Sequence, residues 1–177
     1  MGKAIFIDRD GTIGGNEQVV YPEAFTPFNY VLECMAKLKD SGFLLCSFTN
    51  QPGIAKGEAT REEFENELAS FGFDHIYLCP HQPDEGCQCR KPATGMLRQA
   101  AHEHDLQLHD CVVIGDRWTD MLAAHEAGCI KILVRTGAGE ESLRIYENGE
   151  YEGAYADVSP EFVAADFQEA VNWIIER

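Results

Sequence analysis

The sequence predicts an α/β fold in which a parallel sheet is covered by helices on both faces, as in Rossmann-like proteins. Short apolar runs that suit buried strands alternate along the chain with longer segments of helical periodicity. Such alternation favours parallel strands joined by helical crossovers. Polar residues follow several of the apolar runs. Because open α/β sheets keep their sites at the carboxyl ends of the strands, we expect these polar residues to share one edge.

The expected elements follow from the apolar pattern. Strands are expected at residues 3–7, 43–48, 74–78, 111–114 and 130–134, and helices at 29–41, 60–71, 94–104 and 118–127. The helix at 60–71 begins with Thr60 and has Glu63 three residues later, which is the pattern of a capping box. Residues 138–160 are less regular, so a surface excursion is expected there. A short strand at 162–164 and an amphipathic helix at 167–175 close the chain.

Length and composition indicate one domain over residues 1–177. A chain of 177 residues with 45% apolar residues is normal for a single core, and no repeat or linker is evident. No apolar run is long enough to cross a bilayer, and Lys3 is followed by a short strand that leads directly to Asp8. We therefore expect a cytoplasmic protein with no membrane partner.

The charge of the chain argues against nucleic acid as a partner. Thirty acidic residues against 14 basic ones give a formal net charge of −16. Binding to a phosphate backbone depends on basic patches, which this composition does not favour.

Asp8 and Asp10 are the first candidates for chemistry, because they follow the apolar run Ala4–Ile7 directly. Two carboxylates this close repel each other, which implies a hard cation such as Mg²⁺ or a raised pKa on one of them. The alternative is that Asp-Arg-Asp-Gly is only a turn after a strand.

Three further segments carry candidate residues. Thr49 and Asn50 precede a Gly-containing loop, where a hydroxyl and backbone N–H groups can hold phosphate oxygens, although an ordinary loop has the same composition. Asp116 follows the 111–114 strand, and either Asp116 or Thr119 could cap the next helix. Asp120 would lie in the first turn of that helix, either as a favourable charge at its N-terminus or in a metal shell.

Cys79, His81, Cys87 and Cys89 lie within eleven residues and form the Cys₃His set that suits tetrahedral Zn²⁺. The alternatives are a disulfide or free core cysteines, but a Cys87–Cys89 disulfide would be strained. The remaining four cysteines lie in apolar surroundings and are interpreted as small buried hydrophobes: Cys34, Cys46, Cys111 and Cys129.

The order of these motifs resembles the haloacid dehalogenase (HAD) superfamily of phosphohydrolases over about residues 3–137. Its four motifs correspond to Asp8-x-Asp10-Gly11-Thr12, Thr49-Asn50-Gln51, Lys91, and Gly115-Asp116 with Asp120. The loop at 79–91 runs into Arg90-Lys91-Pro92. It resembles the histidinol-phosphate and D,D-heptose 1,7-bisphosphate phosphatases of subfamily IIIA, which have a structural zinc and no large cap domain.

The resemblance implies a site and a mechanism. Asp8 would be the nucleophile that forms an aspartyl-phosphate, and Asp10 the general acid and base. Mg²⁺ would be bound by the Asp8 carboxylate, the Asp10 main-chain carbonyl and Asp116. Thr49 and Lys91 would hold phosphoryl oxygens, and Asn50 would orient the loop or the substrate. Arg90 and Arg117 would converge with Lys91 at one rim, which would attract an anionic substrate to an acidic protein.

The expected partner is a small phosphorylated metabolite, and the chain is expected to be a monomer or small homo-oligomer. The motifs divide between the two substrates: the five-residue gap from His81 to Cys87 and Arg117 resemble the histidinol-phosphate enzymes, whereas Gly95-Met96-Leu97 and Val134-Arg135-Thr136-Gly137 resemble the heptose enzymes. A polynucleotide end phosphatase and a non-catalytic zinc-bearing interaction module are the alternative functions.

Overall fold

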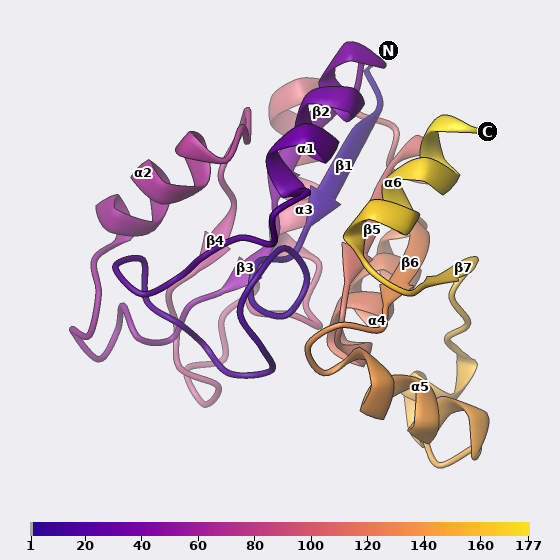
Figure 1. Cartoon of the computed structure of the whole chain (residues 1–177). Helices are drawn as coiled ribbons and strands as arrows, with labels where there is room; N and C mark the ends of the chain where they lie inside the picture. The colour runs from indigo at the N-terminus through magenta and orange to yellow at the C-terminus, as the bar shows by residue number, and fades with distance from the viewer. Residues whose placement is uncertain (1) are drawn as a thin grey trace.

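A parallel sheet of five strands lies at the centre of residues 2–177, the part of the chain that the computed structural model describes. The strand order is β2-β1-β5-β6-β7 (Figure 1). The strands are β1 (Ala4–Ile7), β2 (Leu44–Ser47), β5 (Val112–Gly115), β6 (Ile130–Val134) and β7 (Phe162–Ala164). All neighbouring strands in this sheet pair in parallel, which confirms the predicted fold class.

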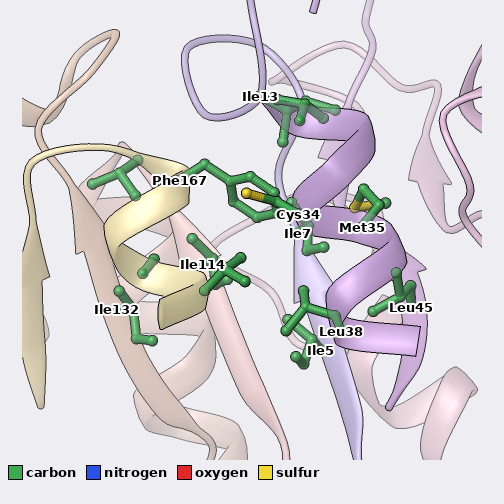
Figure 2. Packing of buried hydrophobic residues seen from close by; sticks show 14 of the residues in the cluster. Ile5, Ile7, Ile13, Cys34, Met35, Leu38, Leu45, Ile114, Ile132 and Phe167 are labelled. Carbon is green, nitrogen blue, oxygen red and sulfur yellow. The ribbon is translucent and has the colours of Figure 1, made fainter. Parts of the chain in front are cut away.

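Helices cover both faces of the sheet. The pair α1 (Val31–Asp40) and α6 (Phe167–Ile175) covers one face, and α3 (Gly95–His104) and α4 (Trp118–Ala127) cover the other. Successive residues of a strand point to opposite faces. Ile5 and Ile7 accordingly pack among residues of α1 and α6 (Figure 2), whereas Phe6 packs with residues of α3 and α4. Two apolar cores thus hold β1 rigidly, so the residues that follow it are well positioned.

Helix α2 (Arg61–Ser70) lies to one side of the sheet (Figure 1) and starts as predicted. Glu63 N donates to Thr60 Oγ1 at 3.2 Å, and Thr60 N donates to Glu63 Oε2 at 2.6 Å. This is the predicted capping box, in which two N–H groups without helical partners are satisfied reciprocally.

The strand predicted at 74–78 is wrong in extent. Only a bridge from His75 to Cys46 and the two-residue strand β4 (Leu78–Cys79) form, and β4 pairs with β3 (Thr49–Asn50) outside the main sheet. The cause is the Ser47 hydroxyl, which accepts from Tyr77 N at 2.9 Å and donates to Tyr77 O at 3.0 Å. The hydroxyl thereby takes the place of a main-chain acceptor for Tyr77 N, whereas Tyr77 O still accepts from Thr49 N at 3.3 Å, and the regular ladder is interrupted.

The surface excursion predicted at 138–160 is more regular than expected. The segment contains α5 (Gly139–Glu147) and a short 3₁₀ helix at Gly153–Asp157. Trp118 of α4 packs against it, with its ring stacked on Tyr151 at a centroid distance of 4.5 Å and tilted against Tyr146 at 4.9 Å. A tertiary contact with a distant residue therefore stabilises helical structure that the local pattern does not show.

The expectation for the remaining four cysteines is met. Cys34, Cys46, Cys111 and Cys129 are buried in the core as predicted. Among residues 2–177, the longest helices fall well short of the apolar length that would carry a segment through a bilayer.

Candidate active site

The carboxyl ends of β1 and β3 border a cavity of about 340 Å³. Seven of the residues predicted from the sequence line it together: Asp8, Asp10, Thr49, Asn50, Arg90, Lys91 and Arg117. Glu17, Val19, Pro52 and Thr119 complete its wall. The fold therefore brings residues that are more than 100 positions apart in the chain to one opening, as expected for the strand ends of an α/β sheet.

Lys91 is buried at the centre of this site, next to two carboxylates. Its Nζ lies 2.8 Å from Asp8 Oδ1 and 2.6 Å from Asp120 Oδ1, and it donates to Phe48 O at 2.6 Å. Burial opposes a charged ammonium, but the carboxylates of Asp120 and Asp8 outweigh it and raise the pKa of Lys91. The Lys91 ammonium group therefore keeps its positive charge next to the Asp8 carboxylate.

Three carboxylates meet beside Lys91. Asp8, Asp116 and Asp120 are all buried, and one oxygen from each lies within 4.8 Å of the others. Burial, followed by the negative charges of Asp8 and Asp120, raises the pKa of Asp116 to about 9. Asp116 Oδ1 has no hydrogen-bond partner among residues 2–177, whereas Oδ2 accepts from Ala138 N at 2.7 Å. A crowded set of hard oxygen donors with an unpartnered oxygen fits a divalent cation such as Mg²⁺.

Asp120 lies in the first turn of α4, as expected, and also pairs with Lys91. Its Oδ2 accepts from Arg117 N at 3.0 Å at the start of α4, and its Oδ1 pairs with Lys91. The predicted caps Asp116 and Thr119 are wrong, because the residue that precedes α4 is Arg117 and its side chain accepts no capping hydrogen bond. Asp116 instead binds the backbone N–H of Ala138.

Asp10 is held by donors on both of its carboxylate oxygens. Oδ1 accepts from Arg9 Nη1 at 2.7 Å and from Val20 N at 3.0 Å, and Oδ2 accepts from Gln51 Nε2 at 2.8 Å. Burial raises the pKa of Asp10 above its usual value, although the Arg9 charge works in the opposite direction. A carboxyl group with a raised pKa can hold a proton more readily than an ordinary aspartate.

Arg9 and Glu67 belong to the site but were missed from the sequence. Arg9 is fully buried, donates to both Glu67 carboxylate oxygens at 2.7 and 2.8 Å, and lies 3.8 Å from the ring centroid of Phe25. The two residues are 58 positions apart, so no local spacing joins them. The remaining signal was an arginine between two aspartates, which by itself indicates only surface charge.

The loop residues predicted to contact a phosphate are ordered by one another. Asn50 Oδ1 accepts from Lys91 N at 3.1 Å, and Asn50 Nδ2 donates to Lys91 O at 3.4 Å, so Asn50 fixes the loop that carries Lys91. Arg90 Nη1 donates to His81 O at 3.3 Å. Arg117 donates to the backbone carbonyl of Glu17. Arg90 and Arg117 thus line the cavity together with Lys91. This is the arrangement expected for an anionic ligand.

The four residues of the Cys/His set converge. Cys89 Sγ lies 3.2 Å from both Cys79 Sγ and His81 Nδ1, and Cys79 Sγ lies 3.6 Å from Cys87 Sγ. Ligands around a tetrahedral zinc with Zn–S bonds of about 2.3 Å stand roughly 3.7 Å apart. The donor set and its spacing therefore fit zinc, and four protein ligands would leave no position for a water molecule.

Several known proteins are similar to this chain in sequence and in fold. A family model described as haloacid dehalogenase-like hydrolase matches residues 15–128, and a related HAD hydrolase-like model matches residues 88–170. D-glycero-beta-D-manno-heptose-1,7-bisphosphate 7-phosphatase of Yersinia pestis is 41% identical over 152 residues, covering 76% of this chain and 81% of that protein. The enzyme of the same name from Bordetella bronchiseptica is 36% identical over 152 residues, covering 80% and 85%.

A solved structure agrees with these sequence relatives. The D,D-heptose 1,7-bisphosphate phosphatase of B. bronchiseptica, complexed with magnesium and phosphate, aligns over 98% of both chains with a TM-score of 0.80 and 31% identity. The family model alone covers more than half of this chain, and the relatives are matched over most of their length. This chain therefore belongs to the haloacid dehalogenase-like hydrolases and is a phosphatase that hydrolyses phosphoric monoesters.

Proposed function

We propose that this protein is a Mg²⁺-dependent phosphatase for small sugar phosphates of the heptose 1,7-bisphosphate type, acting through an aspartyl-phosphate. The main supporting observation is that one cavity is lined by Asp8, which is paired with Lys91, by Asp10 and by two arginines, Arg90 and Arg117. The names of the sequence relatives support the choice of substrate.

The side chains divide the chemistry between them. The Asp8 carboxylate attacks phosphorus in line, and the bond from phosphorus to the leaving alkoxide breaks as the aspartyl-phosphate forms. Asp10 gives its proton to that alkoxide and then takes a proton from the water that hydrolyses the intermediate. Lys91 balances negative charge on the phosphoryl oxygens, and the Thr49 hydroxyl donates a hydrogen bond to one of them. Phosphoryl transfer depends mainly on such positioning and electrostatics.

The residues that would hold Mg²⁺ are the Asp8 carboxylate, the Asp10 main-chain carbonyl and Asp116. When bound, the ion would neutralise negative charge on the transferring group. The acidic cluster at Asp8, Asp116 and Asp120 supports this assignment, because Lys91 pairs with only two of its three carboxylates and Asp116 Oδ1 has no hydrogen-bond partner among residues 2–177.

The substrate is tested by measuring phosphate release, with Mg²⁺, from heptose 1,7-bisphosphate and histidinol phosphate side by side. We expect kcat/KM to be about a hundredfold higher for the heptose bisphosphate, equivalent to about 2.7 kcal/mol in transition-state binding. The reverse preference would assign the chain to the histidinol-phosphate reaction. Equal weak rates would contradict both substrates while leaving the phosphatase chemistry intact.

Magnesium binding should become tighter as the pH rises. In the absence of a cation the pKa of Asp116 is about 9, raised from an ordinary value of 3.8, so the proton stabilises the folded protein at low pH. This stabilisation is lost as the pH rises through about 9. Mg²⁺ must displace the proton, so the rise in Tm on adding Mg²⁺ should grow from pH 6.5 to pH 8.5.

Asp116→Asn is the control for this pH dependence, because an amide has no proton to displace. In that variant we expect a weak effect of Mg²⁺ with no growth over the same pH range. An affinity of the unaltered protein for Mg²⁺ that is the same at pH 6.5 and 8.5 would contradict the assignment.

The Cys/His site should stabilise the loop at 79–91 and take no part in the reaction. Zinc bound by four protein ligands contributes to folding stability and offers no open position. Cys87→Ser should reduce the zinc content, lower the Tm and raise KM more than it lowers kcat. A strong chelator should lower the Tm of the unaltered protein and leave that of Cys87→Ser unchanged. Full activity and an unchanged Tm in zinc-free protein would contradict this role.

A further inference from the structure

We propose that Gln51 is a positioning residue for Asp10, fixing the direction in which the Oδ2 atom of that carboxyl group delivers and recovers its proton. The inference rests on the proposed function, because it requires Asp10 to act as the general acid and base. Gln51 is fully buried and comes from the loop directly after β3, whereas Asp10 follows β1.

Two fixed donors occupy the other oxygen of Asp10, Oδ1. Oδ1 accepts two hydrogen bonds, from Arg9 Nη1 at 2.7 Å and from Val20 N at 3.0 Å. A guanidinium and a backbone N–H are donors only and cannot reverse their roles. They occupy the acceptor positions of Oδ1, and Glu67 holds the guanidinium in place with hydrogen bonds of 2.7 and 2.8 Å. The exchangeable proton of Asp10 therefore belongs on Oδ2.

Asp10 Oδ2 accepts a hydrogen bond from Gln51 Nε2 at 2.8 Å. This hydrogen bond takes one of the two acceptor positions of Oδ2. Asp10 lines the cavity, and its side chain is 12% exposed. The second position of Oδ2 is the one left for the proton and for the oxygen of the leaving group. Without the hydrogen bond from Gln51, the proton could occupy either of the two positions on Oδ2.

Gln51 is itself held in place by hydrogen bonds. Its backbone N donates to Cys79 O at 2.7 Å, and its Nε2 also donates to Thr49 Oγ1 at 2.9 Å. Its Oε1 has no hydrogen-bond partner in the described part of the chain, so the amide is oriented by the two oxygens to which it donates. The bond to Cys79 also connects Gln51 to the start of the Cys/His loop.

The experiment compares leaving groups of different basicity. A nitrophenolate departs without help, whereas phenolate and alkoxide ions need a proton as they leave. Gln51→Met keeps the volume of the side chain and removes the donor. Its kcat/KM should fall about 10- to 100-fold for phenyl phosphate and heptose 1,7-bisphosphate, and by less than about threefold for 4-nitrophenyl phosphate. Gln99→Met, at an exposed glutamine of α3, should match the unaltered protein on all three substrates.

Other outcomes would overturn the inference. An equal loss on all three substrates would mean that Gln51 supports only the fold, and no loss would mean that Asp10 is positioned without it. Gln51→Glu, which keeps a polar side chain of the same length without an N–H donor, repeats the test if Gln51→Met does not fold. Asp10→Asn provides the benchmark: if it affects 4-nitrophenyl and phenyl phosphate equally, the acid role in the proposed function fails whatever Gln51 does.

Discussion

Asp8→Asn should reduce phosphate release to the background of the assay. The amide keeps the shape of the side chain and retains an oxygen for Lys91 Nζ, which lies 2.8 Å from Asp8 Oδ1. It is not a nucleophile for phosphorus, so no aspartyl-phosphate forms. Phosphate monoesters are inert enough that enzymes accelerate their hydrolysis by up to about 10²¹-fold. The remaining binding groups cannot replace the covalent step. Activity should therefore be lost with every phosphate monoester tested.

Asp40→Asn is the matched control, because Asp40 is an exposed aspartate at the end of α1 and does not line the cavity. It should retain full activity and the same Tm. Folded Asp8→Asn protein that keeps more than about a thousandth of the normal rate, once contamination is excluded, would contradict the role of Asp8 as nucleophile.

Lys91→Met should have the second-largest effect, on both activity and stability. Methionine keeps an apolar stem of similar length but leaves Asp8 and Asp120 without their shared cation. Removing one partner of a buried ion pair typically costs about 3–5 kcal/mol. The loss of a positive charge from the transition state should lower kcat/KM by about 10³-fold or more. Urea unfolding in the absence of Mg²⁺ measures the first effect, and phosphate release measures the second.

Lys39→Met is the control for this pair of effects. Lys39 forms an ion pair with Asp74 at 2.8 Å, but its side chain is 38% exposed, and surface pairs contribute about 0–1 kcal/mol. The free energy of unfolding of the Lys39→Met variant should therefore change little, and its activity should not change. If Lys91→Met is no less stable than Lys39→Met, the buried carboxylates do not depend on Lys91 in the way that the geometry indicates.

The sequence predicted those parts of the fold and site that have a local signal. Buried parallel strands are short apolar runs, so β1 and β5 were found, together with the aspartates that follow them. The Cys/His set was found for the same reason, because all four of its residues lie within one loop. The resemblance to the HAD superfamily, carried by motifs in the right order, is confirmed by the matching family model.

The missed features all depend on contacts between distant segments. Arg9 is bound by Glu67, which is 58 positions away, and α5 is held by the Trp118 ring of α4. The strand predicted at 74–78 is interrupted where the Ser47 hydroxyl, in place of a main-chain carbonyl, accepts from Tyr77 N. Gln51 was visible within its motif, but its bond to Asp10 requires the fold to be known. Local patterns predict where side chains can converge, and tertiary contacts decide which of them meet.

The central claim, that Asp8 carries the phosphoryl group, is tested most directly by trapping the intermediate. The protein is mixed with heptose 1,7-bisphosphate and Mg²⁺, quenched in acid during turnover, digested, and analysed by mass spectrometry. We predict phosphate on the peptide that contains Asp8, at that residue, and none in Asp8→Asn treated in the same way. Rapid turnover with the phosphate on another residue would contradict the account.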